Sequence, residues 1–207
     1  MTLKTVDLQP GAPGLSRTLV LLHGFGADEH DLLELGHLLD PRLRVVSLRA
    51  PIAMGGRQRA WYPLSQDARG NLVADPGQVR SGLAAAVEAI EEVARTSPQP
   101  FLLGFSQGGG ISLSVLLTRP ELVAGALSLS GALQPLEPGA VSPQARGKPL
   151  FAGHGRQDPV VSLSRGTRVK EAAEQAGLDL TWREYDMGHQ IIPEELKDAQ
   201  AWLQGKL

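Results

Sequence analysis

Five short and unbroken runs of apolar residues constrain the fold of this chain most strongly. They cover residues 18–22, 43–48, 101–105, 122–129 and 149–152. A strand that is buried on both faces carries apolar residues at successive positions, because neither of its faces meets water. Strands of this kind belong to parallel sheets whose faces are covered by helices. The runs therefore predict the core of a mostly parallel sheet.

Segments with helical spacing of apolar residues lie between these runs. In the first of them, Leu32, Leu35 and Leu39 share one face, and Asp28 is the expected N-cap. Further helices are expected over 79–90, from 107 to 119, over 163–176 and from 193 onward. Residues 178–185 alternate in polarity, which predicts a half-exposed strand near a sheet edge. This alternation predicts an α/β fold with helices on both faces of a mostly parallel sheet.

The composition excludes several classes of protein. The 207 residues contain no cysteine, which removes a disulfide framework, a cysteine-based zinc site and a thiol nucleophile. The 20 Lys and Arg against 22 Asp and Glu leave a net charge of -2, so we expect no nucleic-acid partner. No apolar run approaches the ~20 residues that span a bilayer, and the first residues lack the apolar core of a signal peptide. We therefore expect one cytoplasmic domain over residues 1–207, without stable membrane insertion.

Residues 51–76 interrupt the alternation of strands and helices. This stretch contains glycines at 55, 56 and 70 and four apolar side chains that look exposed, Met54, Trp61, Tyr62 and Leu64. Long connections in compact domains are usually functional or disordered, and disordered segments are poor in aromatic residues. The sequence thus favours an ordered loop beside a site, with simple cover of the core as the alternative.

Residues 104–108, Gly-Phe-Ser-Gln-Gly, carry the spacing G-x-S-x-G between a predicted strand and a predicted helix. A sharp strand-to-helix turn exposes the serine hydroxyl at the sheet edge, and glycines on both sides relieve the crowding of that turn. Ser106 is therefore the candidate nucleophile. The alternative is a glycine-rich turn in which Ser106 only caps the helix. Residues 108–110 are not followed by Gly-Lys-Ser/Thr, which argues against a nucleotide-binding loop.

A serine hydroxyl needs a histidine base and an acid that orients this base. His189 follows the last predicted strand in a short polar link, where it can reach Ser106 from the carboxyl edge of the sheet. In sheets of this kind the acid lies between nucleophile and base in the chain. Asp158 is favoured because it closely follows the strand predicted at 149–152. A simple turn residue is the alternative for Asp158, and Asp186 is a weaker rival as the acid.

His154 also follows a predicted strand, and we expect it to support the loop that carries Asp158. A metal site built from His154, Asp158 and His189 is a less favoured alternative. Asp179 begins a predicted strand and therefore belongs at the opposite edge of the sheet.

Acyl transfer also needs two N–H donors for the oxyanion that forms on the attacked carbonyl. The amide of Gln107, directly after the nucleophile, is the first candidate. The second is the amide of Phe25, in the turn 23–26 between a predicted strand and a predicted helix. Glycines at 24 and 26 let this backbone approach the reacting carbonyl. An ordinary strand-to-helix turn is the alternative for residues 23–26.

Together these motifs resemble the phospholipase/carboxylesterase group of the α/β-hydrolases, which includes acyl-protein thioesterases and small bacterial carboxylesterases. The resemblance covers nearly the whole chain, in ordered blocks at 22–28, 49–51, 61–62, 104–109, 154–161 and 188–189. It implies an α/β-hydrolase fold with Ser106 as nucleophile, His189 as base and Asp158 as orienting acid. It also implies that the Phe25 and Gln107 amides form the oxyanion hole. The implied reactions are hydrolysis of acyl esters, lysophospholipids or thioesters of lipidated proteins, without metal or organic cofactor.

We therefore expect a serine carboxylesterase that cleaves short to medium-chain acyl esters through an acyl-enzyme on Ser106. Its acyl pocket is predicted from apolar residues that flank the catalytic loops, namely Phe25, Met54, Trp61, Leu64 and Val161, with Leu136 as a weaker candidate. Only a short segment separates the strands predicted at 122–129 and 149–152, so no large helical lid is expected.

Several alternatives stay open from the sequence. One is a non-catalytic ligand-binding module on a hydrolase scaffold, because fold does not imply activity. Another is an acyltransferase or perhydrolase that uses the same three residues with a different acceptor. The family often has Asn at the position of Met54 and Asp at that of Pro63, so the wall formed by this loop is expected to differ. A monomer and a homodimer are both compatible with the sequence.

Overall fold

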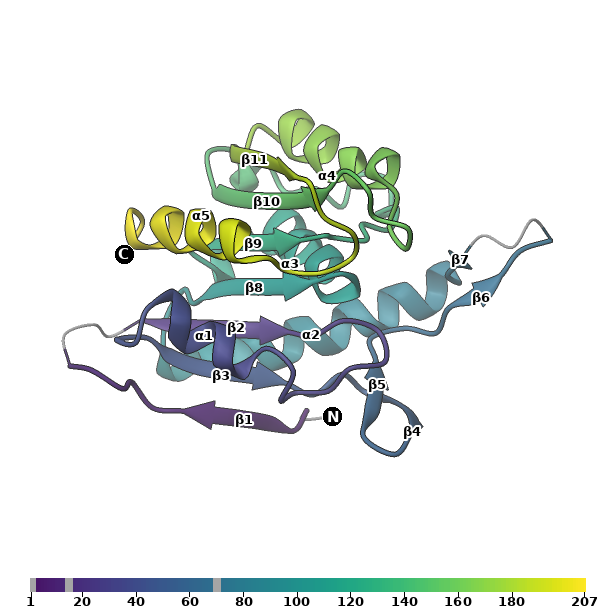
Figure 1. Cartoon of the computed structure of the whole chain (residues 1–207). Helices are drawn as coiled ribbons and strands as arrows, with labels where there is room; N and C mark the ends of the chain where they lie inside the picture. Colours follow the sequence, from purple (N-terminus) through teal and green to yellow (C-terminus); the bar gives the residue numbers. More distant parts are fainter. Residues whose placement is uncertain (1–2, 14–16, 69–71) are drawn as a thin grey trace.

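A seven-stranded sheet forms the centre of the computed structural model, which describes residues 3–13, 17–68 and 72–207 (Figure 1). In spatial order its strands are β1 (Thr5–Leu8), β3 (Arg44–Leu48), β2 (Thr18–Leu22), β8 (Phe101–Phe105), β9 (Gly125–Leu129), β10 (Pro149–Gly155) and β11 (Asp179–Tyr185). All neighbours are parallel except the edge strand β1, which is antiparallel to β3. The predicted mostly parallel sheet is confirmed.

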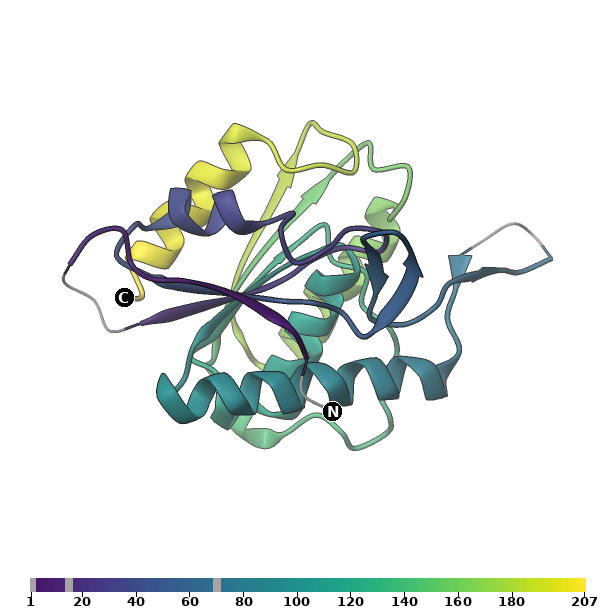
Figure 2. The same cartoon turned by 90° about the horizontal axis from the view of Figure 1, so that it is seen from below.

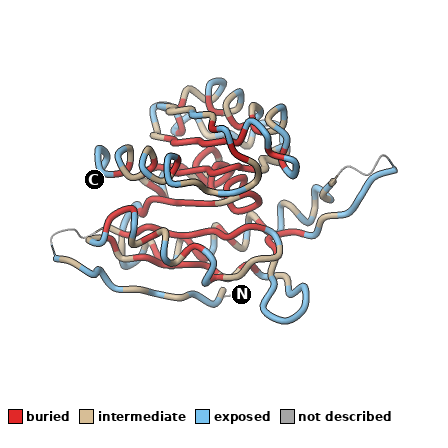
Figure 3. Tube along the Cα trace, in the orientation of Figure 1, coloured by how far each residue is buried: buried red, intermediate tan, exposed pale blue. Residues whose placement is uncertain are grey.

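Helices cover both faces of the sheet (Figure 2). One face carries α1 (Leu33–Leu39) and α5 (Pro193–Gln204), and the other carries α2 (Pro76–Thr96), α3 (Gln107–Thr118) and α4 (Leu163–Ala176). Strand β2 shows why both layers are needed: Leu19 and Leu21 belong to the core below α1 and α5, whereas Val20 and Leu22 belong to the core below α2, α3 and α4. All five residues of β2 are buried, and the central strands form the buried centre of the trace in Figure 3.

Three details of the predicted elements are corrected. Asp28 does not cap α1, which begins only at Leu33; its carboxylate instead accepts from the amide of His30 and pairs with Arg57. The run at 122–129 forms a strand only from Gly125, because residues 120–122 make a 3-10 turn, η1 (Pro120–Leu122), with proline at its start. The short edge strand β1 was not predicted.

The described part of 51–76 is ordered, as expected, and forms two hairpins. They are β4 (Ile52–Gly55) with β5 (Gln58–Ala60), and β6 (Ser65–Gln66) with β7 (Leu72–Val73). Gly70 lies outside the described residues. The expectation that Trp61 and Tyr62 are exposed is wrong, because both are almost completely buried. Their burial follows from hydrogen bonds and packing that join this segment to the strand ends, described below.

The chain leaves β2 toward β3 on one side, yet the neighbour of β2 on its other side is β8. This reversal is a topological switch point, where the loops after two adjacent parallel strands diverge and leave a crevice at their carboxyl ends. Leu22 lies beside Gly104 in the register of the two strands. The turn after Leu22 and the turn after Phe105 therefore start at the same level, and this positions the site.

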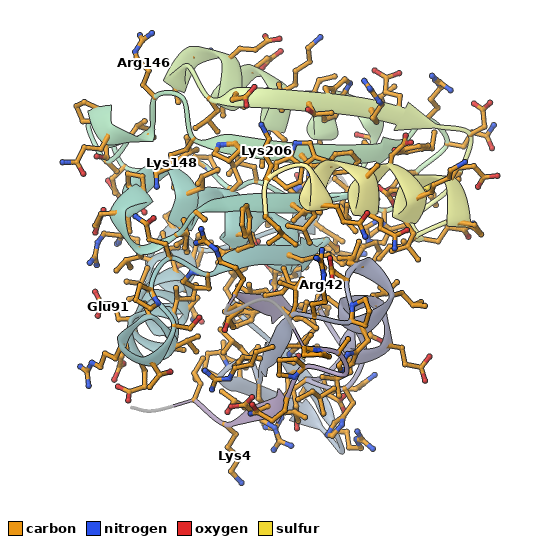
Figure 4. The ribbon with its side chains drawn as sticks, turned by 90° about the vertical axis from the view of Figure 1, so that its left-hand side faces the viewer. Lys4, Arg42, Glu91, Arg146, Lys148 and Lys206 are labelled. Atoms are coloured by element: carbon orange, nitrogen blue, oxygen red, sulfur yellow. The ribbon has the colours of Figure 1, made fainter. Side chains whose placement is uncertain are left out.

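The connection from β9 to β10 contains only one short 3-10 turn, η2 (Pro143–Ala145), so no large lid is inserted there. At the opposite end, where the parallel strands begin, charged side chains are held locally (Figure 4). Lys148 donates to the carbonyl of Val123 at 2.7 Å, and Lys206 pairs with Asp179 at 2.9 Å. Within the described ranges, no helix combines the length and apolar character needed to cross a bilayer.

Glu195 is a buried acid in the first turn of α5. Its side chain lies against β10, where a Cβ added to Gly153 would come within 2.1 Å of Oε1. Neither carboxyl oxygen has a hydrogen-bond partner among the described residues, and burial raises the pKa of Glu195 to about 8. An uncompensated buried charge is costly, so this carboxyl is held in its neutral form near neutral pH.

Candidate active site

Ser106 lies at the sharp turn between β8 and α3. Its backbone has φ 55° and ψ -114°, a region that residues other than glycine rarely adopt. The flanking glycines are required by close approach: a Cβ at Gly108 would lie 1.9 Å from the carbonyl oxygen of Leu22, and one at Gly104 would lie 2.1 Å from that of Gly108. The turn thus packs α3 directly onto β2 and β8 while it presents the serine at their carboxyl ends.

The structure brings the three predicted side chains together. The Nε2 atom of His189 lies 2.9 Å from the hydroxyl of Ser106, and its Nδ1 atom lies 2.7 Å from Oδ2 of Asp158. The Asp158 side chain is fully buried, whereas that of His189 is 16% exposed. A carboxylate can only accept here, so Nδ1 carries the proton and Nε2 is free to accept from the serine.

Asp158 is fixed by its own loop. Its Oδ1 atom accepts from the amides of Val160 and Val161, each at 2.8 Å. His154 donates from Nε2 to the carbonyl of Val161 at 2.7 Å and lies 3.7 Å from Oδ2 of Asp158. His154 therefore supports the acid loop, as predicted. Gly166 lets α4 pack against this imidazole, since a Cβ there would come within 2.5 Å of the ring.

The rival acids are placed elsewhere. Asp186 has a 79% exposed side chain and pairs with Arg156. Asp179 begins β11 at the amino end of the sheet.

Among the described residues, no group of three or more histidines and acids is arranged to hold a metal ion.

The loops after β10 and β11 are tied to each other. The amide of Gln157 donates to the carbonyl of Met187 at 3.1 Å. A side chain at Gly155 would collide with the same carbonyl, at 2.4 Å. On the other side, the ring of Phe105 packs against His189 with centroids 4.9 Å apart. Adjacent parallel strands and the residue before the candidate nucleophile thus fix the position of the imidazole.

Two backbone amides near Ser106 are free. Neither the amide of Phe25 nor that of Gln107 donates to an acceptor in the part of the chain that the structure describes. The turn that carries Phe25 is held from outside, because Gly26 donates to the carbonyl of Arg59 and Arg59 donates to that of Ala27, both at 2.9 Å. Strand β5 thereby fixes the turn while Phe25 N–H stays available.

His23 holds the same turn through hydrogen bonds of its imidazole ring. It is buried, donates from Nδ1 to the carbonyl of Gly24 at 2.8 Å and accepts from the amide of Ala50 at 3.2 Å. Burial lowers the pKa of His23, which agrees with a neutral ring that both donates and accepts.

The side chain of Gln107 is hydrogen-bonded to the backbone of the adjacent aromatic residues Trp61 and Tyr62. Its Oε1 atom accepts from the amide of Trp61, and its Nε2 atom donates to the carbonyl of Tyr62, each at 2.8 Å. The indole of Trp61 donates to the carbonyl of His23 at 3.0 Å. Sequence reasoning did not find this role, because only long-range contacts join residues 23, 61 and 107.

A pocket of about 250 Å³ opens at Ser106. It is lined by Phe25, Tyr62, Leu64, Leu72, Ser106, Gln107, Ala132, Gln134, Val160, Val161, Arg165 and His189. Of the predicted pocket residues, Phe25, Leu64 and Val161 line it. Met54 and Trp61 do not, because Met54 lies 40% exposed on the β4–β5 hairpin and Trp61 is buried beneath the turn. Leu136 lines separate cavities.

The sheet order, the strand-to-helix turn at Ser106 and the site at the carboxyl ends define an α/β-hydrolase. Within this class the chain belongs to the phospholipase/carboxylesterase family, whose model it matches over residues 8–207. The family is one of hydrolases, and the predicted resemblance is confirmed.

Individual relatives match along most of their length. The Bacillus subtilis protein MhqD is 28% identical over 190 residues, covering 89% of this chain and 90% of MhqD. Acyl-protein thioesterase 1 of Cryptococcus neoformans is also 28% identical, over 219 residues that cover 90% of each chain. The crystal structure of the Bacillus cereus carboxylesterase has the same fold, with a TM-score of 0.84 and 24% identity, covering 99% of this chain and 95% of that one.

Proposed function

We propose that the protein is a serine carboxylesterase that hydrolyses short to medium-chain acyl esters through an acyl-enzyme on Ser106. The observation that carries the proposal is the continuous hydrogen-bond chain from Ser106 through His189 to Asp158. These three side chains offer no donor to a negative charge that develops on the substrate. The free amides of Phe25 and Gln107, beside the serine, supply such donors.

In the first half-reaction, Oγ of Ser106 attacks the ester carbonyl carbon and its proton passes to Nε2 of His189. The imidazolium keeps its Nδ1–H bond to Asp158, and the amides of Phe25 and Gln107 donate to the tetrahedral oxyanion. The C–O bond to the alcohol then breaks, and the alcohol takes the proton from Nε2. Water attacks the acyl-enzyme with the same base, and Ser106 recovers its proton as the carboxylic acid leaves.

The pocket supports an acyl group of limited size. Its volume of about 250 Å³ and its apolar walls at Phe25, Leu64 and Val161 suit a short or medium chain. A lysophospholipid or an acyl thioester would react by the same steps, and acyl-protein thioesterase 1 of Cryptococcus neoformans is among the relatives. The proposed partner is therefore a small acyl ester or thioester.

The test is the intact mass of the protein after exposure to a fluorophosphonate. We expect one adduct on the wild type and none on Ser106→Ala or His189→Ala, because phosphonylation needs both the nucleophile and its base. A folded wild-type protein without an adduct would refute the proposal and favour a binding module. An acyltransferase or a perhydrolase would form the same adduct. Analysis of the products with an added alcohol or peroxide distinguishes these enzymes from an esterase.

Chain-length preference tests the pocket. We expect Leu64→Trp and Val161→Trp each to shift the preferred para-nitrophenyl ester toward shorter acyl chains, because added bulk fills the pocket. The loss for the longest ester should reach about tenfold in kcat/KM, on the scale of one or two misfitted methylenes. Met54→Trp is the matched control, since Met54 is exposed outside the pocket. The same shift in Met54→Trp, or none in the other two variants, would contradict this pocket assignment.

A further inference from the structure

A second cavity adjoins the pocket at Ser106. Its volume is about 470 Å³, and it shares Leu72, Gln134 and Arg165 with that pocket. Arg168 lines the second cavity but not the first. The two cavities therefore meet at Arg165, and Arg168 lines the space beyond the first pocket.

The two arginines lie three residues apart near the start of α4, on one face of the helix. Arg165 is half-buried and Arg168 is exposed. The charge of Arg165 reaches into the first pocket as well. Burial raises the pKa of the Tyr62 hydroxyl to about 12, and the positive charge of Arg165 acts against this rise. Because Arg165 also lines the first pocket, its guanidinium is placed to act on a group bound there.

These arginines differ from most others of the chain. Arg42, Arg49 and Arg119 each pair with an acidic side chain. Neither Arg165 nor Arg168 forms an ion pair with any carboxylate of the described residues. No Asp or Glu is among the described residues that line either cavity. Two guanidinium groups without a counter-ion at the rim of an apolar cavity favour an anionic ligand.

We infer that the cavity at Arg165 and Arg168 binds an anionic group, a carboxylate or a phosphate, carried by the ester that is cleaved at Ser106. The inference rests on the proposed esterase function and narrows its substrate class. Guanidinium groups bind carboxylate and phosphate oxygens through two parallel N–H donors, which lysine cannot do. Such a subsite selects esters with a charged end over neutral esters of equal length.

The anionic group has two sources, the acyl chain or the alcohol. The first is tested with para-nitrophenyl hydrogen adipate against para-nitrophenyl hexanoate, which differ by a carboxylate in place of a methyl group. The second is tested with para-carboxyphenyl butyrate against para-carbamoylphenyl butyrate, where only the charge changes. In one of the two pairs we expect the wild type to prefer the anionic ester by about tenfold or more in kcat/KM.

The variants Arg165→Gln and Arg168→Gln should each reduce this preference at least severalfold, and added salt should weaken it in the wild type. Arg146→Gln is the matched control, since Arg146 packs against Gly177 at the other end of α4 and lines neither cavity. A wild type that cleaves the neutral esters without preferring either anionic one would overturn the inference. So would a preference that both Arg165→Gln and Arg168→Gln retain.

A binding measurement separates this inference from the proposed function. Calorimetric titration of Ser106→Ala with para-nitrophenyl hydrogen adipate and with para-carboxyphenyl butyrate reports affinity without turnover. If no ester of either pair is cleaved, the esterase proposal fails, while tighter binding of an anionic ester that is lost in Ser106→Ala/Arg165→Gln still supports the anionic subsite. Equal binding in both backgrounds contradicts it.

Discussion

Replacing Ser106 with alanine is expected to lower kcat for para-nitrophenyl butyrate by about 10⁵-fold or more, the scale seen when a serine nucleophile is removed from its triad. The hydroxyl of Ser106 is hydrogen-bonded to Nε2 of His189, and no other hydroxyl of the described residues is. Asp158→Asn should cost about 10⁴-fold, because an amide can offer an N–H to Nδ1 and so favour the wrong tautomer. Both values come from initial rates of nitrophenolate release.

Ser81→Ala provides the control for Ser106→Ala, since Ser81 is exposed on α2 and its hydroxyl donates to the carbonyl of Gly77. We expect its kcat to stay within twofold of the wild type. Circular dichroism must show that Ser106→Ala is folded. Residual turnover above about 1% in folded Ser106→Ala would exclude Ser106 as the nucleophile, because alanine cannot form the acyl-enzyme.

The second large effect concerns stability and pH at Glu195. A carboxyl whose pKa rises from 4.5 to about 8 on folding binds its proton more tightly in the folded state. The free energy of unfolding should therefore fall as the pH rises through that window. We expect the wild type to lose roughly 3 kcal/mol more than Glu195→Gln between pH 5 and pH 8. Urea unfolding at the two pH values measures this difference.

Glu194→Gln is the matched control, because Glu194 is the preceding residue and is exposed. It should show the same pH dependence as the wild type. Glu195→Gln should be similar to the wild type at pH 5, where the acid is neutral, and more stable at pH 8. Parallel pH profiles for the wild type and Glu195→Gln would mean that the carboxyl is not protonated in the folded state.

Buried strands and the residues directly after them were well predicted from the sequence. The runs at 18–22 and 101–105 are strands with the expected ends, and the helix expected at 163–176 has the same bounds in the structure. Ser106, Asp158 and His189 each follow a strand, and parallel strands place such residues at one edge. A local pattern was therefore enough to bring these three side chains together.

Residues whose position depends on distant contacts were not predicted correctly. Trp61 reads as an exposed loop aromatic, but its neighbours are His23 and Gln107, which are far away in the chain. Met54 lies beside the same aromatic segment in sequence, yet the β4–β5 hairpin turns it away from the pocket. Arg165 has no local signal, because only the fold places the start of α4 against the pocket.

Strands β2 and β8 are neighbours in the sheet, so residues 23–100, which include β3, form one long connection between two adjacent strands. Hydrogen bonds of Arg59 hold the first part of this connection to the turn that carries Phe25, and those of Trp61 and Tyr62 hold it to Gln107. Beyond Tyr62, Leu64 and Leu72 line the pocket at Ser106, and α2 begins at Pro76. The cost of closing a longer loop grows slowly with its length. Insertions there can remodel substrate selection during evolution while the reacting atoms keep their positions, so specificity and chemistry are inherited as separable parts.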